Sequence, residues 1–187
     1  MAIVGSMKIE KTMPSKLFHL LCLQVDDIKS EKLTRYHFKE DALRSLMGEL
    51  LVRYMLETHF SLSRNAIRFQ TNSFGKPELM DVKNLHFNLA HSGNWVVVAI
   101  DKNPIGIDIE EMKSIDIDVM KEVLTTQEIK SLQALPANEQ PSFFYDLWTL
   151  KESYVKYKGK GFTIPPSSIS VDVSTENFIK LFDINSK

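Results

Sequence analysis

The sequence predicts an α+β fold. Of its 187 residues, 43% are hydrophobic and 25% are charged, which is typical of a globular protein. Helix-like and strand-like segments are mixed along the chain, without the regular strand–helix alternation of a parallel α/β sheet. The formal net charge of −1 argues against a nucleic-acid-binding protein, because such proteins present a basic surface. The single cysteine, Cys22, permits no disulfide within the chain.

The first part of the chain is expected to contain one long helix flanked by strands. The apolar run 17–25 predicts a buried strand, and the charged stretch 26–39 leads into the helix. Residues 67–70 predict a short strand, and the Gly and Pro residues of 72–77 predict a loop. Within 39–60 the apolar residues recur at the spacing of one buried helical face, at Ala42, Leu43, Leu46, Met47, Leu50, Leu51, Tyr54 and Met55.

The middle of the chain is expected to form a hairpin. Residues 85–90 alternate in polarity as a half-buried strand does. Residues 95–100 and 105–110 then predict two strands joined by a turn at 101–104.

The second part is expected to be helical at first and to end in strands. Residues 115–124 predict a helix, and Thr125 with Glu128 forms a capping-box signal for a second one that ends before Pro136. A longer helix is expected between Pro141 and Gly159, because glycine is favoured just past a helix end. The alternating run 167–173 predicts a strand, with 177–184 as its hairpin partner.

The sequence offers no membrane or secretion signal. No apolar run approaches the roughly 18 residues that span a bilayer. The N-terminus lacks the basic region and the small-residue cleavage site of a secretory signal. We therefore expect a cytoplasmic protein that has no membrane partner.

The segment GIDIE at 106–110 is a candidate metal site. In an extended strand Asp108 and Glu110 lie on the same face, and two neighbouring carboxylates that repel each other favour a cation between them. Mg²⁺ suits this spacing because it binds through one or two carboxylates together with waters and substrate phosphates. A half-exposed strand with a solvated acidic face is the alternative interpretation.

The helix expected over 143–158 carries a second set of reactive groups. Glu152 lies four residues after Trp148 and four before Lys156, so the three side chains share one stripe. A surface Glu–Lys pair is the commoner outcome of this spacing. A partly buried Glu152 would instead need a partner, and a metal shared with Asp108 and Glu110 would provide one.

Together these segments resemble a known family. GIDIE at 106–110 and WTLKESYVK at 148–156 resemble the paired signature of the 4'-phosphopantetheinyl transferases, in particular the single-chain Sfp-type (surfactin-synthetase-activating) class. The resemblance extends through KEDALR at 39–44, FGKP at 74–77, FNLAHSGNW at 87–95 and KGKGF at 158–162. It implies transfer of phosphopantetheine from coenzyme A to a serine of an apo acyl or peptidyl carrier protein, with release of 3',5'-ADP. Peptide-synthetase, polyketide and fatty-acid carriers are all compatible, which connects the chain to secondary-metabolite or antibiotic biosynthesis.

The resemblance also implies an architecture. It predicts a monomer built of two similar α+β halves in a pseudo-twofold arrangement, with the active site in the cleft between them. Residues 1–104 would bind the coenzyme A nucleotide, and 105–187 would bind metal and carry catalysis. Against the family pattern, the second half is expected to be shortened at its C-terminal end.

The resemblance assigns roles to individual residues. Asp108, Glu110 and Glu152 match ligands of Mg²⁺, for which Mn²⁺ can substitute, and Glu152 also matches the general base. Lys156 matches a lysine that contacts the phosphates. The remaining matches are contacts of coenzyme A, at Lys29, Lys32, Arg44, Ser45, Lys76 and His91. Ala90 departs from the pattern, since relatives usually have a serine there.

Two other functions are compatible with parts of the sequence. A binding module for coenzyme A or a carrier protein, with turnover lost through C-terminal truncation, would not need the complete set of acids and Lys156. A Mg²⁺-dependent nucleotide hydrolase would not need the WTLKESYVK context. Neither a Walker-type glycine loop nor a Rossmann fingerprint is present to indicate another class of nucleotide enzyme.

Overall fold

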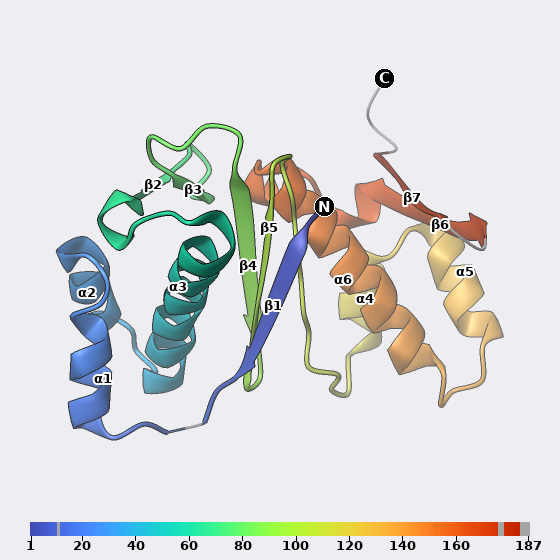
Figure 1. Cartoon of the computed structure of the whole chain (residues 1–187). Coiled ribbons are helices and arrows are strands. Elements are labelled where there is room, and N and C mark those ends of the chain that lie inside the picture. Colours follow the sequence, from blue (N-terminus) through green and yellow to red (C-terminus); the bar gives the residue numbers. More distant parts are fainter. Residues whose placement is uncertain (11, 176–177, 184–187) are drawn as a thin grey trace. The chain divides into compact units, whose positions relative to one another are not determined.

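The computed structural model describes residues 1–10, 12–175 and 178–183, and it has the predicted α+β class. The chain forms two compact units (Figure 1). Unit 1 comprises Met1–Gln70 and Pro77–Ile105, and unit 2 comprises Thr71–Lys76 and Gly106–Lys187. The loop Thr71–Lys76 thus belongs to unit 2 although it lies within the first half of the sequence. In the described part of the chain, no helix has both the length and the apolar character that a membrane span requires.

Unit 1 is built around a three-stranded antiparallel sheet in the order β1-β5-β4. Helix α3 packs against this sheet (Figure 1), and the strands β2 and β3 form a separate short pair. The elements in chain order are β1 (Ile3–Lys8), α1 (Ser15–Cys22), α2 (Asp27–Thr34), α3 (Lys39–Phe60), the 3₁₀ turn Arg64–Ala66, β2 (Phe69–Thr71), β3 (Pro77–Leu79), β4 (His86–Ser92) and β5 (Trp95–Asp101).

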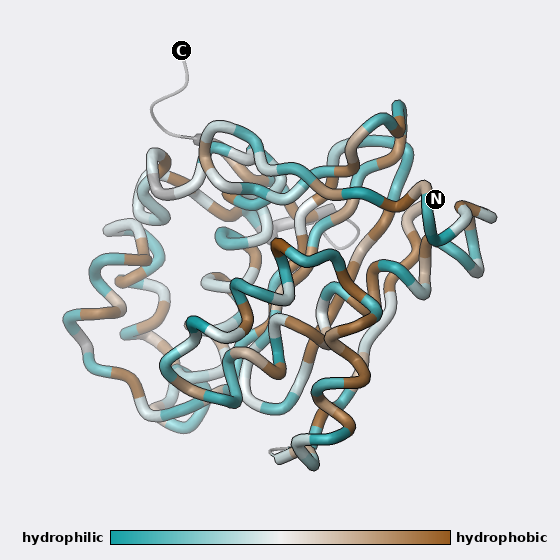
Figure 2. Tube along the Cα trace, turned by 90° about the vertical axis from the view of Figure 1, so that its left-hand side faces the viewer, coloured by the Kyte–Doolittle hydropathy of each residue, from teal (hydrophilic) through white to brown (hydrophobic). Residues whose placement is uncertain are grey.

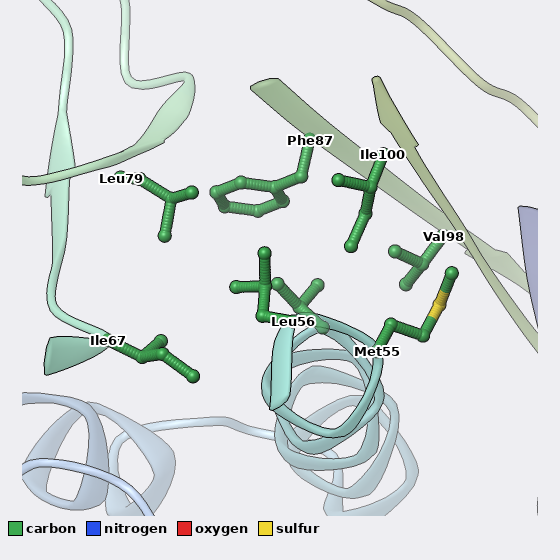
Figure 3. Packing of buried hydrophobic residues seen from close by; sticks show 8 residues of the cluster. Met55, Leu56, Ile67, Leu79, Phe87, Val98 and Ile100 are labelled. Carbon is green, nitrogen blue, oxygen red and sulfur yellow. The ribbon is translucent and has the colours of Figure 1, made fainter. Parts of the chain in front are cut away.

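The long helix α3 confirms the prediction for 39–60 and supplies much of the core of unit 1. Figure 3 shows Met55 and Leu56 of this helix facing Phe87, Val98 and Ile100 of the sheet. The predicted apolar face is wrong at Tyr54, whose side chain is 61% exposed. The buried positions also include Val52 and Leu56, because the face that meets β4 and β5 lies further round the helix.

The strand predicted over 17–25 is wrong, since residues 17–22 belong to helix α1 and 23–25 form the turn that follows it. Phe18, Leu21 and Cys22 have helical spacing and pack against the cores that α3 builds, whereas Leu17 and Leu20 are exposed. A short apolar run does not distinguish a strand from a helix, so the partner element decides. The charged stretch that follows contains α2, whose first turn is capped by the side chain of Asp26.

The hairpin predicted over 95–110 is also wrong. Strand β5 already has β4 on one side and β1 on the other, so no edge is left for 105–110, which has neither helical nor strand structure. The observed hairpin joins β4 to β5 through the two-residue turn Gly93–Asn94, where Gly93 has a φ of 53°. The sequence pattern does not predict β1, which pairs with β5 from Ile3 opposite Ile100 to Lys8 opposite Trp95.

Unit 2 follows the predicted order of elements. It contains α4 (Ile117–Val123), α5 (Thr126–Ala134), α6 (Gln140–Lys158), the 3₁₀ turns Gly161–Thr163 and Pro166–Ser168, and the antiparallel pair of β6 (Ile169–Thr175) and β7 (Phe178–Asp183). Residues 177 and 184, at the ends of the predicted last strand, lie outside the described residues. Figure 2 shows brown and teal positions interspersed along the helices, as expected for helices that bury one face.

The predicted capping box is confirmed at the start of α5. The Glu128 backbone N–H donates to Thr125 Oγ1 at 3.2 Å, and the Thr125 N–H donates to Glu128 Oε2 at 2.8 Å. The same carboxylate also has a role that the capping signal does not indicate. The buried Lys151 Nζ donates to Glu128 Oε2 at 2.5 Å and to the Val123 carbonyl at 2.9 Å. Glu128 Oε1 accepts the Val171 N–H at 3.0 Å, so one carboxylate joins α5, α6 and β6.

Candidate active site

Helix α6 carries two of the predicted catalytic residues. Its first turn contains Pro141, and its last residue is followed by Gly159 in the left-handed conformation, with a φ of 65°. Its buried side chains include Phe144, Leu147 and Val155, which face the interior of unit 2. Glu152 and Lys156 lie beside this apolar stripe and are only partly buried, so both can reach a bound ligand.

The structure brings Lys156 and Asp108 together across 48 positions of sequence. The Lys156 ammonium donates to Asp108 Oδ1 in an ion pair. The Asp108 side chain is 3% exposed, whereas that of Lys156 is 30% exposed. A charged lysine therefore reaches from the accessible side of the site toward a buried carboxylate, which needs such a partner.

Glu152 has a perturbed acidity. Burial raises the pKa of Glu152, the negative charge of Asp108 raises it further, and Glu110 adds a smaller increase, while Lys156 lowers it. Glu152 therefore interacts electrostatically with both of the other predicted metal ligands. Excess negative charge in a partly buried site favours either a proton or a bound cation.

These acids fit a Mg²⁺ ion that is completed by substrate. Among the described His, Cys, Asp and Glu side chains, no group of three or more is placed so that it could hold a metal ion by itself. Mg²⁺ does not require one, because it usually takes one or two carboxylates and fills its other positions with waters and phosphate oxygens. The hard oxygen donors and their mutual repulsion match this mode of binding.

Close backbone packing holds the acidic segment against α6. Gly106 lies so near the helix that an added Cβ would stand 2.6 Å from the Tyr157 backbone N and closer still to the Ser153 carbonyl oxygen. Only glycine fits at this approach, which explains the first residue of the GIDIE motif. The contact places Asp108, two residues later, beside the turn that carries Lys156.

Gly106→Ala is expected to destabilise the protein by about 1–3 kcal/mol and to lower activity, because the segment must move away from α6. Thermal unfolding followed by circular dichroism measures the first effect. Gly48→Ala is the matched control: its Cβ would meet the Leu89 side chain at an ordinary 3.4 Å, within helix α3. That variant should be stabilised by about 0.5–1 kcal/mol. Equal melting temperatures for the two variants would contradict the packing argument.

The loop Thr71–Lys76 brings Lys76 to the end of α6. Asn72 shapes the loop, because its Oδ1 accepts the N–H groups of Phe74 at 2.9 Å and Lys76 at 3.0 Å. Its Nδ2 donates to the Gly159 carbonyl at 3.0 Å. Lys76 Nζ donates to the Lys156 carbonyl at 2.6 Å, so two of the predicted phosphate-binding lysines are neighbours. A cation is favoured at this end of a helix by the exposed carbonyls.

The structure also joins two of the predicted coenzyme contacts in unit 1. Lys29 Nζ donates to Ser45 Oγ at 2.9 Å and lies 3.6 Å from Glu49 Oε2. The Tyr36 hydroxyl donates to the same Ser45 oxygen at 3.0 Å. The sequence did not predict that Glu49 would join this group. Glu49 is buried, and its Oε1 accepts a hydrogen bond from Arg53 Nη2 at 2.8 Å. The spacing of four between Glu49 and Arg53 on a buried helical face is the signal that could have indicated this pair.

The other residues of unit 1 that are predicted to contact coenzyme A are Arg44, His91 and Lys32. Arg44 pairs with Asp41 and donates through Nη1 to the Gly93 carbonyl at 3.1 Å, which ties α3 to the β4–β5 turn. His91 is exposed on β4, and Ala90 beside it is buried. Lys32 has an exposed side chain on α2 and does not join the group around Ser45 in the part of the chain that the structure describes.

The chain is similar to known 4'-phosphopantetheinyl transferases. Residues 104–186 match the model of the 4'-phosphopantetheinyl transferase superfamily, and residues 12–103 match that of the 4'-phosphopantetheinyl transferase N-terminal region. The chain is 41% identical over 153 residues to 4'-phosphopantetheinyl transferase Sfp of Bacillus subtilis (strain 168), covering 82% of this chain and 68% of that protein. It is 40% identical over 165 residues to 4'-phosphopantetheinyl transferase gsp of Aneurinibacillus migulanus, covering 88% and 69%.

The chain is also similar to a more distant mammalian protein. The mouse L-aminoadipate-semialdehyde dehydrogenase-phosphopantetheinyl transferase is 29% identical over 180 residues, which cover 88% of this chain and 58% of that protein. The chain spans 61% to 69% of the length of the five Bacillus and Aneurinibacillus relatives. By these identities and the two family-model matches, the chain belongs to the 4'-phosphopantetheinyl transferase superfamily, in its Sfp-type class.

Proposed function

We propose that this protein transfers 4'-phosphopantetheine from coenzyme A to a serine of an apo acyl or peptidyl carrier protein, with release of 3',5'-ADP. The observation that carries the proposal is a group of three side chains: Lys156 of α6 is paired with the buried Asp108, and Glu152 of α6 interacts with that same acid. Phosphoryl transfer needs positive charge around phosphates together with a group that takes a proton, and this grouping contains both.

Asp108, Glu110 and Glu152 would hold Mg²⁺, with Mn²⁺ as a substitute. When bound, the ion neutralises phosphate charge and acts as a Lewis acid on phosphoryl oxygens. Their mutual interaction, which raises the pKa of Glu152, supports this assignment because a cation relieves the repulsion.

Glu152 would accept the proton of the carrier serine. The serine oxygen forms a bond to the β-phosphorus of coenzyme A, and the bond from that phosphorus to the bridging oxygen of the leaving 3',5'-ADP breaks. Burial raises the pKa of Glu152 in the metal-free site, which strengthens it as a base, whereas ligation to Mg²⁺ would lower its basicity. Lys156 has three N–H donors, so it can stabilise charge on the departing phosphate while it remains paired with Asp108.

The nucleotide end of coenzyme A would be bound by cationic and polar side chains of residues 1–104. Lys29 supports this part of the proposal, because its ammonium is held at Ser45 by a hydrogen bond of 2.9 Å and remains 20% exposed. Charge-assisted hydrogen bonds from lysine and arginine are the strong contacts to phosphate. The set comprises Lys29, Lys32, Arg44, Ser45, Lys76 and His91.

The direct test measures the mass of a carrier protein. Apo carrier, coenzyme A and Mg²⁺ are incubated with the protein, and we expect the carrier to gain one phosphopantetheine group while one equivalent of 3',5'-ADP appears. A carrier whose serine is replaced by alanine is the control and should stay unchanged. Unchanged mass with several carriers, despite coenzyme A binding, would contradict the proposal and favour a binding module. Release of 3',5'-ADP without a gain in carrier mass would favour a hydrolase.

A further inference from the structure

The acidic segment that bears Asp108 and Glu110 has no secondary structure of its own. Residues 104–116 form neither helix nor strand between β5 and α4. Backbone groups of such a segment are not fixed by a helix or a sheet ladder, so tertiary contacts must set its position. A carboxylate that ligates a metal has to be held within a fraction of an ångström of its working position.

Besides the ion pair of Asp108 with Lys156, two contacts with α6 involve the backbone of this segment, near residues 106 and 113. Near its start, the Gly106 backbone packs directly on the helix at Ser153 and Tyr157. At residue 113, the Tyr145 hydroxyl accepts the Lys113 backbone N–H at 2.9 Å and lies 3.4 Å from the Lys113 carbonyl oxygen. Asp108 and Glu110 lie between these two points of attachment.

Tyr145 is itself held firmly. Its side chain is 7% exposed and belongs to the core cluster of unit 2 with Phe144 and Leu147. Its ring stacks on Trp148, with centroids 5.9 Å apart and planes 4° apart. A buried ring in this setting has little freedom, so its hydroxyl presents a fixed acceptor to the segment.

Tyr145 also shares a helix face with the proposed base. It precedes Glu152 by seven residues, which is about two turns of an α-helix. One helix therefore carries Glu152 and also fixes both ends of the segment that carries Asp108 and Glu110. We propose that Tyr145 is a positioning residue: its hydroxyl holds residue 113 so that the carboxylates of Asp108 and Glu110 stay aligned for metal binding. The inference rests on the proposed function only in taking these acids as Mg²⁺ ligands.

The test is Tyr145→Phe, which removes one oxygen and keeps the stacked ring. Lys113→Ala is the matched control, because it keeps the backbone N–H that Tyr145 accepts and removes an exposed side chain whose ammonium pairs with Glu111 and interacts more weakly with Glu110. Amide hydrogen exchange should become about tenfold faster at residues 107–113 in Tyr145→Phe. Exchange at residues 107–113 should stay unchanged in Lys113→Ala. In Tyr145→Phe, exchange at the backbone of α6 should stay unchanged. This readout does not require that the protein be active.

The second readout is the Mg²⁺ dependence of transfer. Removing a partner that orients metal ligands typically costs 10- to 100-fold in metal affinity. We expect Tyr145→Phe to need 10- to 100-fold more Mg²⁺ for half-maximal rate, to recover most of its rate at saturating Mg²⁺, and to keep its KM for coenzyme A. Lys113→Ala should need no more Mg²⁺ than the unsubstituted protein, because it removes a positive charge near Glu110 and keeps the backbone N–H that Tyr145 accepts.

Three results would overturn the inference. One is unchanged exchange at 107–113 in Tyr145→Phe. Another is an unchanged Mg²⁺ requirement. The third is a loss of rate that follows a lowered melting temperature and is not recovered by Mg²⁺, since that would indicate a merely structural role. Failure of the proposed function gives a different result, because the unsubstituted protein would then modify no carrier. The hydrogen-exchange measurement would still show whether Tyr145 holds the segment.

Discussion

Asp108→Asn is expected to lower the rate of phosphopantetheine transfer by about 10²- to 10³-fold, the usual cost of removing a group that stabilises charge in the transition state. Asparagine keeps the size of the side chain but removes the negative charge that Lys156 contacts and that Mg²⁺ would bind. The initial rate of carrier mass gain at saturating coenzyme A measures the effect. The fold should survive, because Lys156 is 30% exposed and its ammonium can be hydrated without its partner.

The matched control for this prediction is Glu111→Gln. Glu111 lies in the same segment but is exposed and pairs with Lys113 at 2.8 Å on the surface. It should keep the rate of the unsubstituted protein within about twofold, since exposed ion pairs contribute little. Transfer by Asp108→Asn at the normal rate would show that the metal assignment is wrong.

Glu152→Gln is expected to reduce transfer by about 10²- to 10⁴-fold, the range that a general base contributes, while leaving the protein at least as stable as before. Burial and the charge of Asp108 raise the pKa of Glu152, so the folded state disfavours the ionised carboxylate. At any pH above this raised pKa the ionised group therefore costs stability, and a neutral amide avoids that cost. Activity and stability should thus change in opposite directions.

The sign of the stability effect gives a pH dependence. The gain in melting temperature of Glu152→Gln should be full above the raised pKa of Glu152 and should vanish as pH falls below the ordinary pKa of a glutamate, where the wild-type side chain is protonated in both states. Melting curves with a chelator and no added divalent ion test this. Glu122→Gln, an exposed acid on α4, is the control and should show no such trend. A destabilised Glu152→Gln that transfers normally would contradict both the base and the burial arguments.

Local signals account for the helices that the sequence predicts well. The apolar period over 39–60, the Thr125–Glu128 capping box and the Gly159 helix end each involve residues within a few positions of one another. Such interactions form wherever the segment lies, so pattern and propensity suffice to predict them.

The secondary structure predicted from the sequence is wrong where contacts with distant segments determine whether a helix or a strand forms. The run 17–25 is a helix because α3 offers a surface for Phe18 and Leu21, and that surface is not visible in the run itself. The strand predicted over 105–110 does not form because β1, from the other end of the chain, occupies the edge of β5. Strand pairing depends on which segments compete for the same edge, and residue type carries little of that information.

The candidate site likewise combines features that the sequence indicates with features that only the tertiary structure shows. Residue type and spacing indicated Asp108, Glu110 and Glu152 as possible metal ligands, with a solvated acidic face and a surface Glu–Lys pair as alternatives. The family resemblance added the phosphate role of Lys156. The backbone contact of Gly106 with α6, the docking of Lys76 on the Lys156 carbonyl and the hydrogen bond from Lys113 to Tyr145 emerged only from the tertiary structure. Each joins residues at least 32 positions apart through a backbone group. Backbone groups are nearly the same in every residue, so residue types do not indicate which of them will form such a contact.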